Sequence, residues 1–235
     1  MKNSEDLKTL VLAKNWAKQG ETQASIIIVE ALLKKYPHDF SIVTNLGDLL
    51  EIENPLKALD YYSKILSGED EWLEFLAKVT DIERGILFER HGLLALNLSD
   101  ESSALESFRK ASALGHESLP LWSLLSLLYA HFQEYELAAK ALIRSIELFK
   151  EPTLFCISKD LGKIVINEDF YSNITLTLIP HLNKKESSKI IYDLKIIFLT
   201  RPWIADLEQI ISQDSPNMPI KNSGESYVSI DTKNR

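Results

Sequence analysis

The sequence has a single cysteine, Cys156, among 235 residues. One cysteine allows no internal disulfide and no paired thiolates for a metal. Because Cys156 lies in an apolar run, we expect it to be a buried, inert thiol and not a nucleophile. Glycine and proline are also scarce, at eight residues each, whereas Leu, Ile, Ala, Glu and Lys are abundant. This composition favours helix.

Long apolar runs are missing as well. No stretch reaches the 18 or more apolar residues that a membrane-spanning helix needs. The first residues of the sequence lack the apolar core of a signal peptide. We therefore expect no membrane partner and a cytoplasmic location.

Basic residues are outnumbered, with 26 Lys and Arg against 34 Asp and Glu, for a formal net charge of -8. Such a balance repels the phosphate backbone and argues against a nucleic-acid partner. The one short basic cluster is formed by Lys184, Lys185 and Lys189, which share one helical turn. We favour its interpretation as a solvated helix face.

Catalytic and metal-binding motifs are lacking too. There is no phosphate-cradling Gly-rich loop, no paired-Cys site and no His-Glu-x-x-His motif. The five histidines are scattered, and only His91 occupies a core position of the pattern described below. It could be a buried functional base, but we favour a satisfied core histidine at a helix crossing. The sequence therefore predicts no enzyme, no cofactor, and no catalytic or metal-ligating residue.

What the sequence does contain is a pattern repeated at a spacing of 34 residues. A large, a medium and a very small residue recur at helical spacing, followed by one more residue of the same helix face, first as Phe88, His91, Gly92 and Ala95, then as Trp122, Leu125, Ser126 and Tyr129. After a turn, a small, a large and a small residue follow, as Ala104, Phe108 and Ala111, then as Ala138, Leu142 and Ser145. Each half predicts a helix, a short turn and a second, antiparallel helix.

Two earlier segments, residues 6–36 and 39–70, fit the same template. Gly47 lies 34 residues after Ala13, at the position of the very small residue. We expect these small residues where the two helices of a repeat cross closely, because a longer side chain would push the backbones apart. The expected crossing residues are Ala13, Gly47, Gly92 and Ser126 on first helices, and Ala58, Ala104 and Ala138 on second helices.

On these residues the chain resembles the tetratricopeptide repeat (TPR) family over about residues 5–150. The resemblance implies an all-α fold, a right-handed α-solenoid of four helix-turn-helix repeats, assigned to residues 1–150. Gly47 and Gly92 are 45 residues apart, which indicates an insert near residues 68–84. Its helical spacing predicts an extended first helix or an extra helical turn, and we expect it to separate the second and third repeats.

Beyond residue 150 the template fails. Residues 153–165 could form the first helix of a degenerate fifth repeat, and residues 167–184 mix two-fold and helical spacing. Residues 187–199 and about 201–212 predict two further helices. A terminal repeat needs cover for its apolar face, so residues 151–213 are expected to form a divergent helical cap. Residues 214–235 are expected to be a disordered tail.

In the family, the first helices line a concave groove that receives an extended peptide or a partner helix. The positions that the resemblance assigns to this groove are Lys14, Lys18, Thr44, Asp48, Glu51, Ile86, Glu89, Leu93, Leu96, Asn97, Ser123, Leu127, Ala130 and His131. Some family members hold a C-terminal carboxylate in a clamp. Asn45 and Arg90 fall at compatible places, but Leu10, Lys14 and Ile86 do not supply the other clamp side chains.

The resemblance therefore implies a non-enzymatic scaffold or adaptor that binds a protein or peptide partner. In the alternative, the chain is a regulatory or enzyme-associated protein whose C-terminal region, residues 167–212, has a separate activity. The groove either receives a partner helix or is filled by the chain's own residues 190–198. The oligomeric state is left open.

Overall fold

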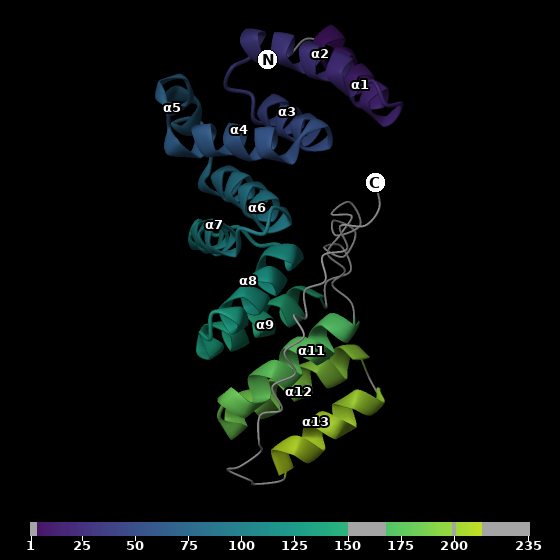
Figure 1. Ribbon diagram of the computed structural model, residues 1–235, viewed down its shortest axis with the longest axis vertical. Helices are drawn as coiled ribbons and strands as arrows, with labels where there is room; N and C mark the ends of the chain where they lie inside the picture. The colour runs from purple at the N-terminus through teal and green to yellow at the C-terminus, as the bar shows by residue number, and fades with distance from the viewer. Residues whose placement is uncertain (1–3, 150–167, 199–200, 213–235) are drawn as a thin grey trace. The chain divides into compact units, whose positions relative to one another are not determined.

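A computed structural model of the chain describes residues 4–149, 168–198 and 201–212. Within these residues every regular element is a helix (Figure 1). The chain divides into two compact units, residues 1–116 and residues 117–235, which are called here the N-terminal unit and the C-terminal unit. The helix expected at 153–165 and the tail expected at 214–235 lie outside the described residues.

The N-terminal unit is a stack of three antiparallel helix pairs with one additional short helix. Its helices are α1 Ser4–Lys18, α2 Thr22–Lys35, α3 Phe40–Glu53, α4 Pro55–Ser67, α5 Asp70–Leu76, α6 Asp81–Asn97 and α7 Glu101–Ala113. The pairs are α1 with α2, α3 with α4, and α6 with α7, and each pair packs against the next through α2–α3 and α4–α6 contacts. This is the arrangement that the 34-residue pattern predicts.

Local side-chain chemistry sets where these helices begin. The Asp39 carboxylate accepts a hydrogen bond from the Ile42 amide at 3.1 Å and caps α3. The Asn54 side chain accepts one from the Leu56 amide at 2.9 Å, and Pro55 is the first residue of α4. Thr80 and Glu83 form a reciprocal capping box at the start of α6. Each such cap satisfies amide groups that have no partner inside the helix.

Gly47 and Gly92 lie where the two helices of a repeat cross, and neither position has room for a side chain. A Cβ atom at Gly47 would lie 2.0 Å from the hydroxyl oxygen of Tyr62 on α4. A Cβ atom at Gly92 would lie 2.6 Å from the ring of Phe108 on α7. Tyr62 and Phe108 are both fully buried, so neither ring can turn aside into solvent. The crossing is thus closed by an aromatic ring over a bare backbone.

We expect Tyr62→Phe to leave the stability unchanged or to raise it by about 1 kcal/mol. Within the described part of the chain, the Tyr62 hydroxyl has no hydrogen-bond partner. Burial raises the pKa of this phenol, so the group stays neutral at ordinary pH. Removing a buried, unsatisfied hydroxyl recovers its desolvation cost. Urea unfolding followed by circular dichroism tests this, and a loss above about 1 kcal/mol would contradict the unsatisfied state.

The insert near residues 68–84 contains a separate short helix, α5. It is not an extension of α6, because Thr80 caps α6 anew. Trp72 and Phe75 of α5 are buried. The Trp72 ring packs edge-on against the Tyr61 ring of α4, with 5.6 Å between the ring centroids. The expectation that the insert separates the second and third repeats was wrong. α4 packs directly against α6, and α5 lies to the side of α4 (Figure 1).

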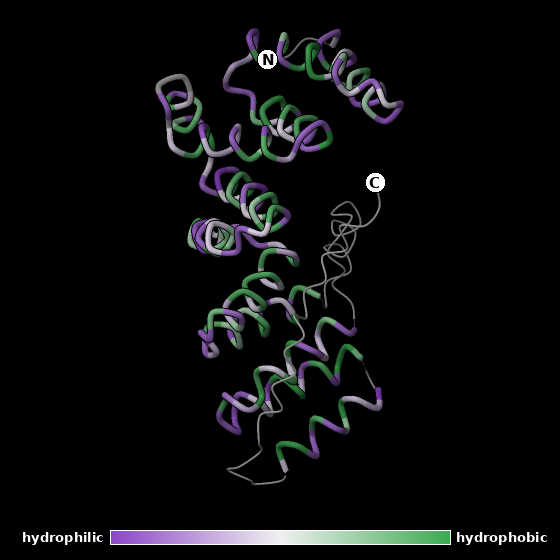
Figure 2. The backbone as a smooth tube through the Cα atoms, in the orientation of Figure 1, coloured by the Kyte–Doolittle hydropathy of each residue, from purple (hydrophilic) through white to green (hydrophobic). Residues whose placement is uncertain are grey.

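The C-terminal unit joins the fourth repeat to the helices that follow it. Its elements are α8 Leu119–His131, α9 Tyr135–Phe149, α11 Glu168–Leu178, the 3-10 turn η2 Ile179–His181, α12 Lys184–Phe198 and α13 Pro202–Ser212. α8 is the most apolar, and Figure 2 colours most of it as hydrophobic. α11 packs against α8 and α9, whereas α12 packs against α9 and α13. The helices expected at 187–199 and 201–212 are therefore present.

One core unites this unit. Ile146 of α9, Tyr171 of α11, Leu194 of α12 and Leu207 of α13 all belong to the same buried apolar cluster. Residues 168–178, whose mixed spacing gave no clear expectation, form a regular helix because Tyr171, Ile174, Thr175 and Leu178 are buried along one side of it. The described helices after α9 thus cover the apolar surface of the fourth repeat.

Candidate partner-binding surface

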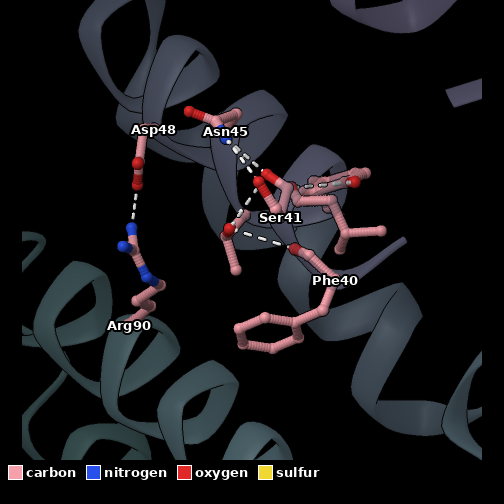
Figure 3. Close-up of polar contacts among 8 residues, drawn as sticks. Phe40, Ser41, Asn45, Asp48 and Arg90 are labelled. Carbon is pink, nitrogen blue, oxygen red and sulfur yellow. Dashed lines mark hydrogen bonds and ion pairs between the residues drawn. The ribbon is translucent and has the colours of Figure 1, made fainter. Parts of the chain in front are cut away.

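The first helices of the N-terminal unit, α1, α3 and α6, carry most of the expected groove positions. α3 and α6 are neighbours. Arg90 of α6 forms an ion pair with Asp48 of α3 (Figure 3). The Asp48 side chain keeps 45% of its surface exposed and that of Arg90 keeps 34%. The ion pair therefore links the first helices of two successive repeats at a partly exposed position.

The residues that resemble a carboxylate clamp are engaged inside the protein. The Asn45 side-chain amide donates to the backbone oxygen of Ser41, one turn earlier in α3 (Figure 3). The Arg90 guanidinium is paired with Asp48. Both groups that could hold a peptide carboxylate thus already have a partner inside the protein, and the other clamp side chains are missing at Leu10, Lys14 and Ile86.

The fourteen expected groove residues differ in how much of their surface is exposed. Four are exposed, namely Lys14, Lys18, Glu51 and His131. Six are partly buried, namely Asp48, Ile86, Glu89, Leu93, Asn97 and Leu127. Four are buried, namely Thr44, Leu96, Ser123 and Ala130. Ten positions therefore keep surface for a partner.

Ser123 requires the clearest correction. It has no exposed surface, and its hydroxyl lies 2.6 Å from the Ser145 hydroxyl of α9. Ser145 in turn lies 2.8 Å from the hydroxyl of Tyr171 on α11. Ser123 thus belongs to a buried polar chain that ties three helices of the C-terminal unit together. The small residue that we expected at position 145 therefore also provides a hydroxyl that bonds to α11.

Thr44, Leu96 and Ala130 are also removed from the expected binding set. Thr44 is 8% exposed and donates its hydroxyl hydrogen bond to the Phe40 oxygen of its own helix at 3.0 Å. Leu96 is 5% exposed and Ala130 is 8% exposed. Side chains this deeply packed offer little area to a ligand.

Glu89, another expected groove residue, pairs with His116 within the N-terminal unit. The Glu89 carboxylate lies 2.7 Å from Nε2 of His116, and the side chains are 13% and 11% exposed. Gly85, one turn before Glu89 on α6, makes room for this histidine, because a Cβ atom there would lie 2.5 Å from the His116 Cβ. We conclude that Glu89 fixes the end of the third repeat.

His91 bridges three helices of the N-terminal unit. Its Nε2 lies 3.0 Å from the Ser63 hydroxyl of α4, and its Nδ1 lies 2.8 Å from the Ser107 hydroxyl of α7. Both ring nitrogens thus have hydrogen-bond partners. This geometry agrees with a satisfied core histidine. The sequence pattern did not identify Ser63 or Ser107, although each faces His91 from a helix that packs against α6.

We expect acid to destabilise the wild-type protein more than a His91→Leu variant. Burial, with a contribution from the charge of Lys110, lowers the pKa of His91 below its ordinary value of 6.5, against the opposing charges of Asp100 and Glu106. The unfolded chain therefore binds this proton more readily than the folded chain, and stability falls as pH drops through 6.5 toward the folded pKa.

Urea unfolding at several pH values between 7.5 and 5 measures this difference. The slope of the unfolding free energy against pH should be steeper for wild type than for the variant. Equal slopes would show that His91 has the same proton affinity folded and unfolded.

The residues that the structure describes contain no group of three or more His, Cys, Asp or Glu side chains placed to hold a metal ion. No helix among them combines the length and apolar character required to cross a bilayer.

Comparison with known proteins gives a fold but no sequence relative. Neither protein-family models nor curated protein sequences yield a significant match. Among solved structures, MamA residues 41–end from Desulfovibrio magneticus RS-1 has a TM-score of 0.52 at 13% identity, covering 91% of this chain and 99% of that one. A MamA double mutant, RS-1 ArsTM, has a TM-score of 0.53 at 13% identity, covering 90% and 98%.

A third similar structure is YrrB, described as a TPR protein with an unusual peptide-binding site. It has a TM-score of 0.52 at 13% identity, covering 86% of this chain and 90% of its own. Together with the stacked helix pairs and the small crossing residues, these likenesses confirm the resemblance found in the sequence. The chain has the helical-repeat fold of the tetratricopeptide proteins.

Proposed function

We propose that this protein is a non-enzymatic interaction scaffold that binds a protein or peptide partner on α1, α3 and α6 of the N-terminal unit. The observation that carries the proposal is the stack of three helix pairs whose first helices keep charged side chains exposed, at Lys14, Lys18 and Glu51. Repeat stacks of this kind bind partners along an extended surface. The peptide-binding site described for YrrB supports the same use of the fold.

The side chains on this surface suggest how a partner would be held. Ile86 and Leu93 of α6 are partly buried and offer apolar contact, while Lys14 and Glu51 offer charges of both signs. A peptide with mixed charge and a few apolar residues matches that mixture. The proposed site consists of the eight positions with remaining surface on these three helices, namely Lys14, Lys18, Asp48, Glu51, Ile86, Glu89, Leu93 and Asn97. Leu127 and His131 lie on α8 of the C-terminal unit and are not part of it.

The C-terminal helices favour a structural role over a separate activity. α11, α12 and α13 share one apolar core with α9, so this part is the continuation of the fourth repeat. The segment that we considered as a possible filler of the groove, residues 190–198, lies in α12 and packs against the second helix α9. A cytoplasmic location stays a prediction of the sequence.

A paired charge reversal tests the proposed site. Lys14→Glu with Glu51→Lys changes the first-helix surface without changing the net charge. Glu30→Lys with Lys34→Glu makes the same exchange on α2, where both residues are also exposed. Each variant would be used to capture partners from native cell extract after circular dichroism confirms its helix content.

A partner that wild type and the α2 variant retain, and the first-helix variant loses, would support the proposal. A partner list that is the same for all three proteins would contradict it. Loss in both variants would also contradict it, because it would show a general charge effect.

A further inference from the structure

The outward face of α12, in the C-terminal unit, exposes two large apolar residues. Tyr192 is 66% exposed and Ile196 is 51% exposed. They lie four residues apart and so occupy the same side of the helix. The opposite side of α12 is buried through Ile190 and Leu194. Apolar residues on both sides go beyond what packing the cap requires, because the outer surface of a terminal element is expected to be polar.

Lysines flank this apolar pair on both sides. At 100° per residue, Lys189 falls on one flank of the pair, and Lys184 and Lys195 fall on the other. Lys185 lies in line with the pair, two turns before Tyr192. All four lysines are exposed. The acidic residues of the helix, Glu186 and Asp193, lie at the far edge of the exposed arc. Glu186 accepts a hydrogen bond from the Asn183 side chain at 2.8 Å.

A shallow depression runs between this face and α13. It is lined by apolar residues of both helices, Ile191 and Tyr192 of α12 and Ile211 of α13, together with Lys184. The one carboxylate that borders the depression, Glu208 of α13, forms an ion pair with Lys195. The acidic charge at the depression is thus compensated by Lys195. Lys185 and Lys189 do not line the depression, and they add positive charge on the other side of Tyr192.

We propose that the α12–α13 face is a second docking surface, distinct from the α1–α3–α6 surface, and that its partner is an acidic amphipathic helix. Leucine-type side chains of the partner would cover Tyr192, Ile196 and the depression, and its Glu or Asp residues would meet the lysines. The argument is charge complementarity: an apolar strip between lysines, in a chain whose net charge is -8, selects an acidic ligand.

The geometry favours a helix over a bilayer. Two adjacent helices with a depression between them present a groove, which is the shape that receives an amphipathic helix. A membrane-surface helix instead needs a broad apolar face directed outward. On α12 the large apolar residues of the outward face are Tyr192 and Ile196, whereas the broad apolar face is directed into the core.

The test uses a fluorescein-labelled designed peptide of 18 residues, with Leu at helical spacing and Glu at most other positions. Titration with the full-length protein should give a saturable rise in anisotropy that weakens as salt increases. Tyr192→Ser with Ile196→Ser, and separately Lys185→Glu with Lys189→Glu, should each weaken binding by about tenfold or more. All four positions are exposed, so the variants should keep the fold.

A matched control makes the same types of exchange on α4, where Leu56 and Lys57 are exposed. Leu56→Ser with Lys57→Glu should leave the affinity unchanged. A peptide that does not bind, or that loses the same affinity in the control, would overturn the proposal. Vesicles of phosphatidylserine and phosphatidylcholine form the other arm, and binding to them with no binding to the peptide would assign the face to an anionic membrane surface instead.

Discussion

Replacing Tyr171 with alanine is expected to lower the free energy of unfolding by about 3–5 kcal/mol, the range for deleting a buried aromatic side chain. Tyr171 has no exposed surface. The centroid of its ring lies 5.4 Å from that of Phe149 on α9 and 5.7 Å from that of Phe198 on α12. The substitution removes these contacts and the bond to Ser145 together. We expect the C-terminal unit to lose the docking of α11.

Tyr171→Phe separates the two contributions. It keeps the ring contacts and removes only the hydroxyl, so about 1–2 kcal/mol of stability should be lost. Burial raises the pKa of Tyr171 to about 12, despite the hydrogen bonds from Ser145 and Ser123 that lower it, so the hydroxyl is protonated at neutral pH. Urea unfolding followed by tryptophan fluorescence and circular dichroism measures both variants. Equal losses for Ala and Phe would contradict the importance of the ring contacts.

Gly47→Ala should destabilise the N-terminal unit by about 2–3 kcal/mol, because it overpacks a closed crossing. Alanine is favoured over glycine in a helix by about 1 kcal/mol, so at an open position the same substitution would stabilise. At Gly47 the new methyl group would meet the hydroxyl, Cζ and Cε2 atoms of Tyr62 at 2.0–2.8 Å. The sign of the effect therefore distinguishes a packing role from a backbone preference.

Two further variants make this test specific. Comparing Glu51→Gly with Glu51→Ala measures the cost of glycine at an exposed position of the same helix. Combining Gly47→Ala with Tyr62→Phe removes the closest of the three contacts, so the double variant should lose less stability than the sum of the single ones. Strict additivity would show that the two residues do not meet.

The repeats could be predicted from the sequence because their signal is steric and local. Gly47 and Gly92 mark positions where only a bare backbone fits, and each lies 34 residues from another small residue, Ala13 for Gly47 and Ser126 for Gly92. The partners of these glycines were not predicted. The crossings were assigned to pairs of small residues, whereas the atoms that fill them belong to the Tyr62 and Phe108 rings. The spacing of small residues identifies where two helices cross, but only the three-dimensional packing shows which side chain fills the space.

The candidate surface was less predictable, because the orientation of a side chain depends on tertiary contacts. Ser123 has a suitable position in the repeat, yet Tyr171, 48 residues later in the sequence, anchors the chain of hydroxyls that includes it. Hydrogen bonds between elements this far apart leave no periodic pattern. Exposed charges such as Lys14 and Glu51 were assigned to the surface from their place in the repeat, and both side chains are exposed in the structure.

The lateral position of α5 has a consequence for engineering. The residues between α4 and α6 form a side branch, so their number can change while the contact between those two helices is kept. Residues 77–79 must keep their conformation, because their amides bond back to α5 and Val79 packs against the core shared by α4, α5 and α6. A variant that changes the length of the branch should therefore keep this turn and the buried Trp72 and Phe75, so that the stacked helix pairs are not disturbed.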